Sequence, residues 1–413
     1  MKGTVHYEVK DGVAILTVDN PPVNPLSDGV RAGLVDNIKK AEDDSDIIGV
    51  VLTGAGRSFI AGADISEFGK SPDGPGLDEA FKSLEFCSKP VVAAINGSAL
   101  GGGLETALVC NYRIAGPAAF VGLPEVNLGL LPGAGGTQRL PRLVGPAEAL
   151  KMMLTGMHVN AKKALDMGII DEISDDLIND SVNFVKKVSS ESGDHPKVRD
   201  LNEKVLEARG SENILLEAKA MAAKSRKGQF APGQIIKCVE AAINLDDFDE
   251  GMKKESDYFI ECLVNPQREA MIHIFFGERA ASKIADVPRE TPIKDIKKAG
   301  IIGSGTMGGG IAMCFANAGI PVHIIDQDED NLKRGVSVIE KNYQFMVDRG
   351  RMNLEMKEGV FGLISSSLDY NDVADCDIVI EAVYENLDLK EQIFKTLDEV
   401  VKDDAILASN TSG

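Results

Sequence analysis

The chain has 413 residues, more than one ordinary domain holds, so two or three domains are expected. Its composition is 44% hydrophobic and 26% charged with no tryptophan, which is typical of a globular protein, and no apolar run is long enough to predict a membrane span. The formal net charge of −20 argues against non-specific binding of nucleic acid. The six cysteines are scattered and are expected to be reduced thiols of an intracellular protein, with neither a disulfide framework nor a metal site.

The N-terminal part predicts a hairpin, a helix and a buried strand. Residues 4–19 alternate around an Asp-Gly turn, the pattern of two paired strands. A helix is expected to begin at Ser27 or Asp28 and to end near Lys40. Further along, the sequence predicts a strand at 49–56, a tight Ala-Gly-Ala turn at a helix start within 58–68, a flexible loop at 71–76 and a helix at 77–86.

Residues 91–140 are the stretch around which the chain is organised. The buried strand at 91–95 is followed by a turn, by three glycines at 101–103 and by an apolar helix whose first turn carries Glu105. Glu125 follows Pro124 and precedes a second glycine-rich turn at 132–136. Two carboxylates in apolar sequence, beside turns with free backbone N–H groups, suggest acid–base chemistry on a substrate that develops an oxyanion. Taken singly, Glu105 would more often be a favourable helix-dipole partner and Glu125 a solvated loop residue.

After residue 140 the sequence is rich in helices and then changes its pattern. Helices are predicted at 145–156 and 160–168, a short strand at 171–174, and helices through nearly all of 176–286. Residues 287–295 contain two prolines and alternating charges and are the best linker candidate. Beyond them strands at 297–303, 320–326, 376–383 and 405–410 alternate with helices at 306–319 and 328–350, which predicts a parallel, doubly wound half-sheet.

The start of that half-sheet carries a possible dinucleotide fingerprint. The glycines of this GxGxxG motif follow a strand and open a helix, and Asp326 ends the next strand. This context predicts a pyrophosphate at the helix N-terminus and an adenosine ribose on Asp326, which favours NAD over NADP. The alternative is a glycine-rich helix entry without a ligand. The cofactor-binding residues expected from the motif are Gly303, Gly305, Thr306, Met307, Gly308 and Asp326.

The segments SFIAGAD and LGGGLE, with Glu125 and GAGGTQRL, resemble the crotonase (enoyl-CoA hydratase) superfamily over about the first 180 residues. The resemblance implies an oxyanion hole made by the backbone N–H groups of Ala61 and Gly102, with Glu105 and Glu125 as catalytic acids. It implies a coenzyme A thioester as substrate and no cofactor for its hydration. Asp64 is expected to be a helix cap near the CoA-binding backbone. The implied substrate-binding residues are Ala63, Asp64, Ile65, Pro124 and Gly133.

The segments GIIGSGTMGGGIA, EAVYENLDLK and ASNTS resemble the NAD domain of 3-hydroxyacyl-CoA dehydrogenases. Matched positions imply that Glu385 and Lys390 lie on the nicotinamide side and that Ser412 contacts substrate. The family's catalytic His–Glu pair comes after the NTS motif, and His323, which lies within a strand, is no substitute. The chain is therefore expected to be truncated, able to bind NAD but not to oxidise a hydroxyacyl-CoA.

The order of parts resembles the bifunctional enzymes of fatty-acid β-oxidation. The expected α/β fold is a crotonase-like ββα spiral domain with a helical extension, followed by a partial Rossmann doubly wound parallel sheet. The expected activity is hydration of 2-enoyl-CoA. Alternatives are a 3-enoyl-CoA isomerase and a non-catalytic protein that binds acyl-CoA or NAD. The expected domains are 1–180 (hydratase core), 181–286 (helical region), 287–295 (linker) and 296–413 (NAD-binding).

The resemblance also bears on assembly and location. The acyl-CoA substrate is the expected partner, with no nucleic acid and no membrane span, and the chain is expected to be a monomer or a small homo-oligomer. A bacterial cytoplasmic location is favoured, with a peroxisomal one as the alternative.

Overall fold

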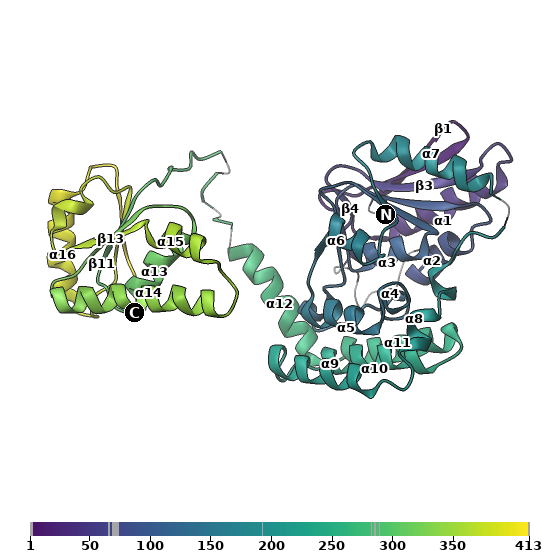
Figure 1. Cartoon of the computed structure of the whole chain (residues 1–413). Coiled ribbons are helices and arrows are strands. Elements are labelled where there is room, and N and C mark those ends of the chain that lie inside the picture. The colour runs from purple at the N-terminus through teal and green to yellow at the C-terminus, as the bar shows by residue number, and fades with distance from the viewer. Residues whose placement is uncertain are drawn as a thin grey trace. The chain divides into compact units, whose positions relative to one another are not determined.

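The computed structural model describes residues 3–64, 67, 74–191, 193–281, 283–284, 286–288 and 290–411. Contacts divide the chain into two compact units, Met1–Ile284 and Ala285–Gly413 (Figure 1). Two predicted site residues, Ile65 and Ser412, lie outside the described residues, as does part of the loop predicted at 71–76. Each unit is described by itself.

The first unit is built on a six-stranded sheet in the order β1-β2-β3-β5-β7-β10. The predicted hairpin is confirmed, with Asp11 at φ 52° and Gly12 at φ 76° in its turn, because two such residues match the twist of paired strands. The strands are β1 (Thr4–Lys10), β2 (Val13–Asp19), β3 (Gly49–Gly54), β5 (Val91–Ile95), β7 (Tyr112–Ala115) and β10 (Glu172–Ile173).

Helices cover both faces of this sheet. Val51 and Val92 pack with Val185 of α7, whereas Leu52 and Ala93 belong to the larger core on the opposite face. Figure 1 shows α7 on one side of β3 and α1 to α3 on the other. Burial on both faces explains why these strands are continuous apolar runs. The helices are α1 (Asp28–Asp43), α2 (Leu77–Glu85), α3 (Gly102–Val109) and α7 (Leu177–Ser189).

A second, four-stranded sheet runs beside the first in the order β4-β6-β8-β9. Three of its strands are parallel and β9 is antiparallel to β8. Their two or three residues carry too little periodicity for β6, β8 and β9 to be predicted. The strands are β4 (Ser58–Ile60), β6 (Ser98–Leu100), β8 (Phe120–Gly122) and β9 (Val159–Asn160).

The rest of the first unit is helical, and α10 packs on α4, α5, α9 and α11. Helices were expected through nearly all of 176–286, which is wrong for residues 195–210, where the structure has only η3 and α8. Glu125 lies in one turn of 3-10 helix, η2, where a loop was expected. The elements are η2 (Glu125–Leu128), α4 (Gly136–Val144), α5 (Pro146–Thr155), α6 (Ala161–Asp166), η3 (Val198–Asp200), α8 (Glu203–Glu207), α9 (Glu212–Ser225), α10 (Ala231–Asn244), α11 (Phe248–Leu263) and α12 (Pro266–Ala281).

The second unit is a parallel sheet in the order β13-β12-β11-β14-β15, which confirms the predicted doubly wound sheet. Adjacent residues Ile301 and Ile302 pack on opposite faces, the first with α13 and α14 and the second with α16. The strands are β11 (Ala299–Ile302), β12 (Val322–Ile325), β13 (Ile364–Ser367), β14 (Ile378–Glu381) and β15 (Ile406–Ser409). The helices are α13 (Thr306–Asn317), α14 (Glu329–Asp348), α15 (Leu354–Phe361), η4 (Tyr370–Val373) and α16 (Leu387–Val400).

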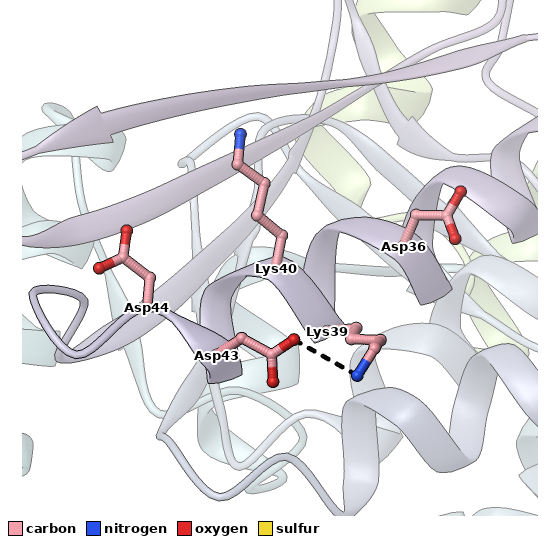
Figure 2. Close-up of a pocket in the computed structure, with 5 residues that line it drawn as sticks. All are labelled: Asp36, Lys39, Lys40, Asp43 and Asp44. Atoms are coloured by element: carbon pink, nitrogen blue, oxygen red, sulfur yellow. Dashed lines mark ion pairs between the residues drawn. The ribbon is translucent and has the colours of Figure 1, made fainter.

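Two further features bear on function: the lengths and polarity of the helices, and a charged depression on α1. Within the described residues, no helix combines the length and the apolar character that crossing a membrane requires. A shallow depression on α1 is lined by mixed charges, with Lys39 Nζ 3.3 Å from the Asp43 carboxylate (Figure 2). This is an exposed ion pair on a helix surface, and such pairs contribute little to stability.

Candidate active site

Glycines at the start of α3 let its backbone pack closely on neighbouring segments of the first unit. A Cβ on Gly103 would overlap the carbonyl oxygen of Ile60 at the end of β4, so only glycine lets the two backbones meet. A Cβ on Gly102 would lie 3.2 Å from the backbone nitrogen of Ala63. The structure therefore places the predicted Gly102 directly against the predicted Ala-Gly-Ala segment.

Glu105 is buried on the first turn of α3, with 3% of its surface exposed. Its Oε1 accepts hydrogen bonds from the backbone N–H groups of Ala134 and Gly136, each at 2.8 Å. These groups belong to the second glycine-rich turn and the start of α4, where helix N–H groups have no partner within the helix. The side chain is thus fixed by the turn that the sequence analysis placed beside it.

Glu125 reaches the same place from η2. A Cβ on Gly101 would lie 2.9 Å from Oε1 of Glu125, so the carboxylate rests on the glycine segment that precedes Glu105. Oε2 of Glu125 is buried and has no hydrogen-bond partner among the described residues. A buried ionised carboxylate without donors is unfavourable, so this oxygen is suited to carry a proton.

The two glutamates differ in their electrostatic surroundings. Burial raises the pKa of Glu105, while the amides of Ala134 and Gly136 and the charge of Arg139 oppose that rise. Burial raises the pKa of Glu125 well above its usual value, and the charge of Glu105 raises it further. In such a pair the carboxyl whose ionised form is better stabilised can act as a base and the other as an acid, which here would be Glu105 and Glu125.

Gly101→Ala is expected to disable this arrangement. Gly101 has φ 54° and ψ −127°, and its new Cβ would push on the Glu125 carboxylate, so we expect a loss of about 1–3 kcal/mol in the free energy of unfolding. Enoyl-thioester turnover should fall as well, measured beside calorimetric unfolding. The matched control is Gly233→Ala in α10, where a Cβ would meet no described atom within 4 Å. Equal behaviour of the two variants would contradict the role given to Gly101.

The predicted oxyanion donor Ala61 does not have a free N–H group. Its backbone nitrogen donates to the carbonyl oxygen of Val23 at 3.1 Å. Ala63, two residues on, lies against Gly102, and neither its N–H nor that of Gly102 donates to another described residue. Because an oxyanion hole needs free donors, the expectation for Ala61 is corrected in favour of Ala63.

The other predicted substrate residues are chain neighbours of these groups. Asp64 follows Ala63, and its carbonyl oxygen accepts the N–H of Glu67 at 3.0 Å. Pro124 is the residue before η2, which begins at Glu125. A Cβ on Gly133 would overlap the ring of Phe259 in α11, so the helical extension packs on the glycine-rich turn.

Sequence reasoning missed one buried acid, Glu255 of α11. It is 1% exposed, and its carboxylate accepts the N–H of Gly135 at 2.7 Å and that of Thr137 at 3.1 Å. One signal was present in the sequence: Glu255 falls on the buried stripe of α11 with Phe248, Gly251 and Cys262, where an acid is out of place.

In the second unit the glycine-rich loop has the form that its motif predicts. Gly303 has φ 107°, a Cβ on Gly308 would overlap the carbonyl oxygen of Gly303, and Gly305 faces open space within the described part. Thr306 and the half-exposed Met307 begin α13. Asp326 ties the loop to β12, since its Oδ2 accepts the Ser304 N–H at 2.9 Å and the Ser304 hydroxyl at 2.6 Å.

Glu385 and Lys390 also lie together, with their charged groups 2.8 Å apart beside a pocket of about 510 Å³. The buried Glu381, which was not predicted, ends β14 and lies 3.2 Å from Lys390. His323 is occupied elsewhere: its two ring nitrogens lie 2.7 Å from the hydroxyl of Ser365 and 2.8 Å from that of Ser367. This histidine is a structural residue of the β12–β13 pair, as expected.

The first unit therefore has the crotonase fold of acid–base enzymes, and the second has a Rossmann-type sheet. Residues 8–230 match the family model described as enoyl-CoA hydratase/isomerase, and the chain belongs to that family. Residues 298–413 match the model described as 3-hydroxyacyl-CoA dehydrogenase, NAD binding domain.

Individual relatives agree with this assignment. The peroxisomal fatty acid beta-oxidation multifunctional protein MFP2 of Arabidopsis thaliana is 38% identical over 100% of this chain and 58% of its own length. The fatty acid oxidation complex subunit alpha of Shewanella sp. (strain MR-4) is 38% identical over 98% of this chain and 59% of its own. The crystal structure of an enoyl-CoA hydratase/isomerase from Pseudoalteromonas atlantica T6c has 25% identity and a TM-score of 0.50 over 67% of this chain and 97% of that one. The chain thus spans just under three fifths of the length of these two multifunctional relatives.

Proposed function

We propose that the first unit hydrates 2-enoyl-CoA thioesters to 3-hydroxyacyl-CoA, as part of fatty-acid β-oxidation. The observation that carries the proposal is the unlike setting of two glutamates at one glycine segment, of which Glu105 is buried and Glu125 half-buried. Glu105 is held by two backbone amides, which favour its ionised form, whereas Glu125 has a buried oxygen without a partner in the described structure. One site thus offers a base and an acid at neutral pH.

The reaction follows from these protonation states. Glu105 takes a proton from water while the water oxygen bonds to C3 of the enoyl group, and the π electrons move onto the thioester oxygen as an enolate. The backbone N–H groups of Ala63 and Gly102 would bind that oxygen, and losing one such donor typically costs about 3–4 kcal/mol. As the enolate collapses, C2 takes the proton of Glu125, and exchange through solvent restores both carboxyls.

A comparison of two substrates tests this proposal. The protein should hydrate a short 2-enoyl-CoA much faster than it converts the matching 3-enoyl-CoA. Hydration needs both an acid and a base, whereas shifting a double bond can be done by one glutamate. Comparable turnover of the 3-enoyl thioester would favour the isomerase. Binding of both thioesters without turnover would favour a non-catalytic protein.

We further propose that the second unit binds NAD, which accepts a hydride when it is bound. The open side of Gly305 at the start of α13 leaves room for a pyrophosphate, and the helix dipole favours its charge. Asp326, at the end of β12, would hold the adenosine ribose, and Glu385 with Lys390 would lie on the nicotinamide side.

Asp326→Ala is expected to weaken NAD binding. Hydrogen bonds to a charged group are worth about 1.5–3 kcal/mol, so the Kd should rise roughly 10- to 150-fold. Isothermal titration calorimetry with NAD and NADP would measure it, with NADP bound more weakly by the wild type. The control is Asp330→Ala, an exposed acid in α14. An unchanged Kd for NAD in Asp326→Ala would contradict this assignment.

The proposal extends to organisation and location. We infer functional parts at 1–180, 181–286, 287–295 and 296–413, and a monomer or small homo-oligomer. A bacterial cytoplasmic location is supported by the Shewanella relative, and the Arabidopsis relative, named as peroxisomal, supports the alternative.

A further inference from the structure

The N-terminus of α4 is bound by two carboxylates, not one. Four consecutive backbone N–H groups point alternately to two side chains: those of Ala134 and Gly136 to Glu105, and those of Gly135 and Thr137 to Glu255. The Thr137 hydroxyl also contacts the Glu255 carboxylate. Any movement of Glu255 is therefore passed to the amides that hold Glu105.

We propose that Glu255 is a positioning residue of the hydratase site, which orients Glu105 through the turn at 134–137. The proposal rests on the function proposed above. Glu255 comes from the helical extension, and tight packing holds its helix in place, because a Cβ on Gly251 would overlap the side chain of Gln138 in α4.

The turn also acts on the charge state of Glu105. Burial raises the pKa of Glu105, and the amides of Ala134 and Gly136, each 2.8 Å from its Oε1, oppose that rise, as does the charge of Arg139. Glu105 also faces the carboxyls of Glu125 and Glu255, and burial raises the pKa of Glu255 to about 8. If Glu255 no longer holds its two amides, the neighbouring amides are aimed less well at Glu105 and the pKa of Glu105 rises.

Glu255→Gln tests this role through the pH profile of kcat/KM. Glu105 must be ionised to act, so activity is lost as pH falls through its pKa. With the turn disturbed that pKa rises, and we expect the acid limb to move to higher pH. The disturbed turn should also lower kcat about 10- to 100-fold with little change in KM. The matched control is Glu250→Gln, an exposed glutamate on the same helix.

Glu255→Asp separates position from charge and remains informative if Glu255→Gln fails to fold. It keeps the carboxyl group but shortens the side chain, so it should disturb the turn as well, with a lower kcat and the acid limb at higher pH. A wild-type kcat in Glu255→Asp, or a Glu255→Gln profile equal to that of Glu250→Gln, would overturn the proposal. Failure of the proposed function itself is distinguishable, because the wild type would then give no hydration at any pH.

Discussion

Glu105→Gln and Glu125→Gln are each expected to lower kcat for hydration of a short 2-enoyl-CoA by about two to four orders of magnitude, the usual contribution of one positioned acid or base. Glutamine keeps the size of the side chain and its acceptor oxygen, so the amides of Ala134 and Gly136 can still be bound at position 105. The loss should therefore appear in kcat, with KM for the thioester nearly unchanged.

The two variants should also differ in their dependence on pH. Glu105 must be ionised to act as base, so the wild type loses activity as pH falls through the pKa of Glu105. Glu125 must be protonated, so activity is also lost as pH rises through its raised pKa. Residual activity of Glu105→Gln should lack the acid limb and that of Glu125→Gln the alkaline limb. Glu148→Gln, on the surface of α5, serves as the control. Wild-type rates in both site variants would remove the glutamates from the mechanism.

Arg139→Leu is expected to have the largest effect on stability, about 3–5 kcal/mol in the free energy of unfolding. Arg139 and Glu85 are 4% and 2% exposed, and two hydrogen bonds of 2.9 and 2.7 Å join them. Among the described residues, the ion pair that then remains to the buried carboxylate is the longer one with Arg199, at 3.7 Å. An uncompensated buried charge of this kind is strongly destabilising.

The double variant Glu85→Leu with Arg139→Leu should be less unstable than Arg139→Leu alone, because it removes both charges. Differential scanning calorimetry can compare them, with Lys82→Ala, which breaks the exposed Lys82–Asp78 pair, as the control expected to change little. A double variant as unstable as the single one would show that packing, not charge, is lost. Arg139 also lowers the pKa of Glu105. The fraction of Arg139→Leu that still folds should therefore show an acid limb of its pH profile that is moved to higher pH.

Local signals in the sequence were enough to predict much of the fold. The Asp11-Gly12 turn predicts the first hairpin because both residues tolerate positive φ. The alternation of strand and helix after residue 296 likewise predicts the parallel sheet of the second unit. Three-residue strands such as Ser98–Leu100 were not predicted, because their pairing partners are distant in the chain. The strand Ile364–Ser367 was not predicted either, because three of its four residues are serines and give no apolar pattern.

The site was predictable to the extent that it depends on short motifs. Glu105 and Glu125 stand beside glycine turns, and those turns are what they contact. Which alanine offers a free N–H group depends on Val23, far earlier in the chain, so Ala61 could not be excluded from the sequence. Glu255 binds a turn about 120 residues before it, and only the packing of α11 on α4 reveals that contact.

Hydration in water enriched in oxygen-18 tests the central claim most directly. The wild type is incubated with a short 2-enoyl-CoA, and the thioester is analysed by mass spectrometry. The account predicts a 3-hydroxyacyl-CoA that carries one oxygen-18 atom on C3, with the thioester intact. Recovery of unchanged 2-enoyl-CoA from a protein that still binds it, or its hydrolysis to free acid and coenzyme A, would contradict a hydratase built on Glu105 and Glu125.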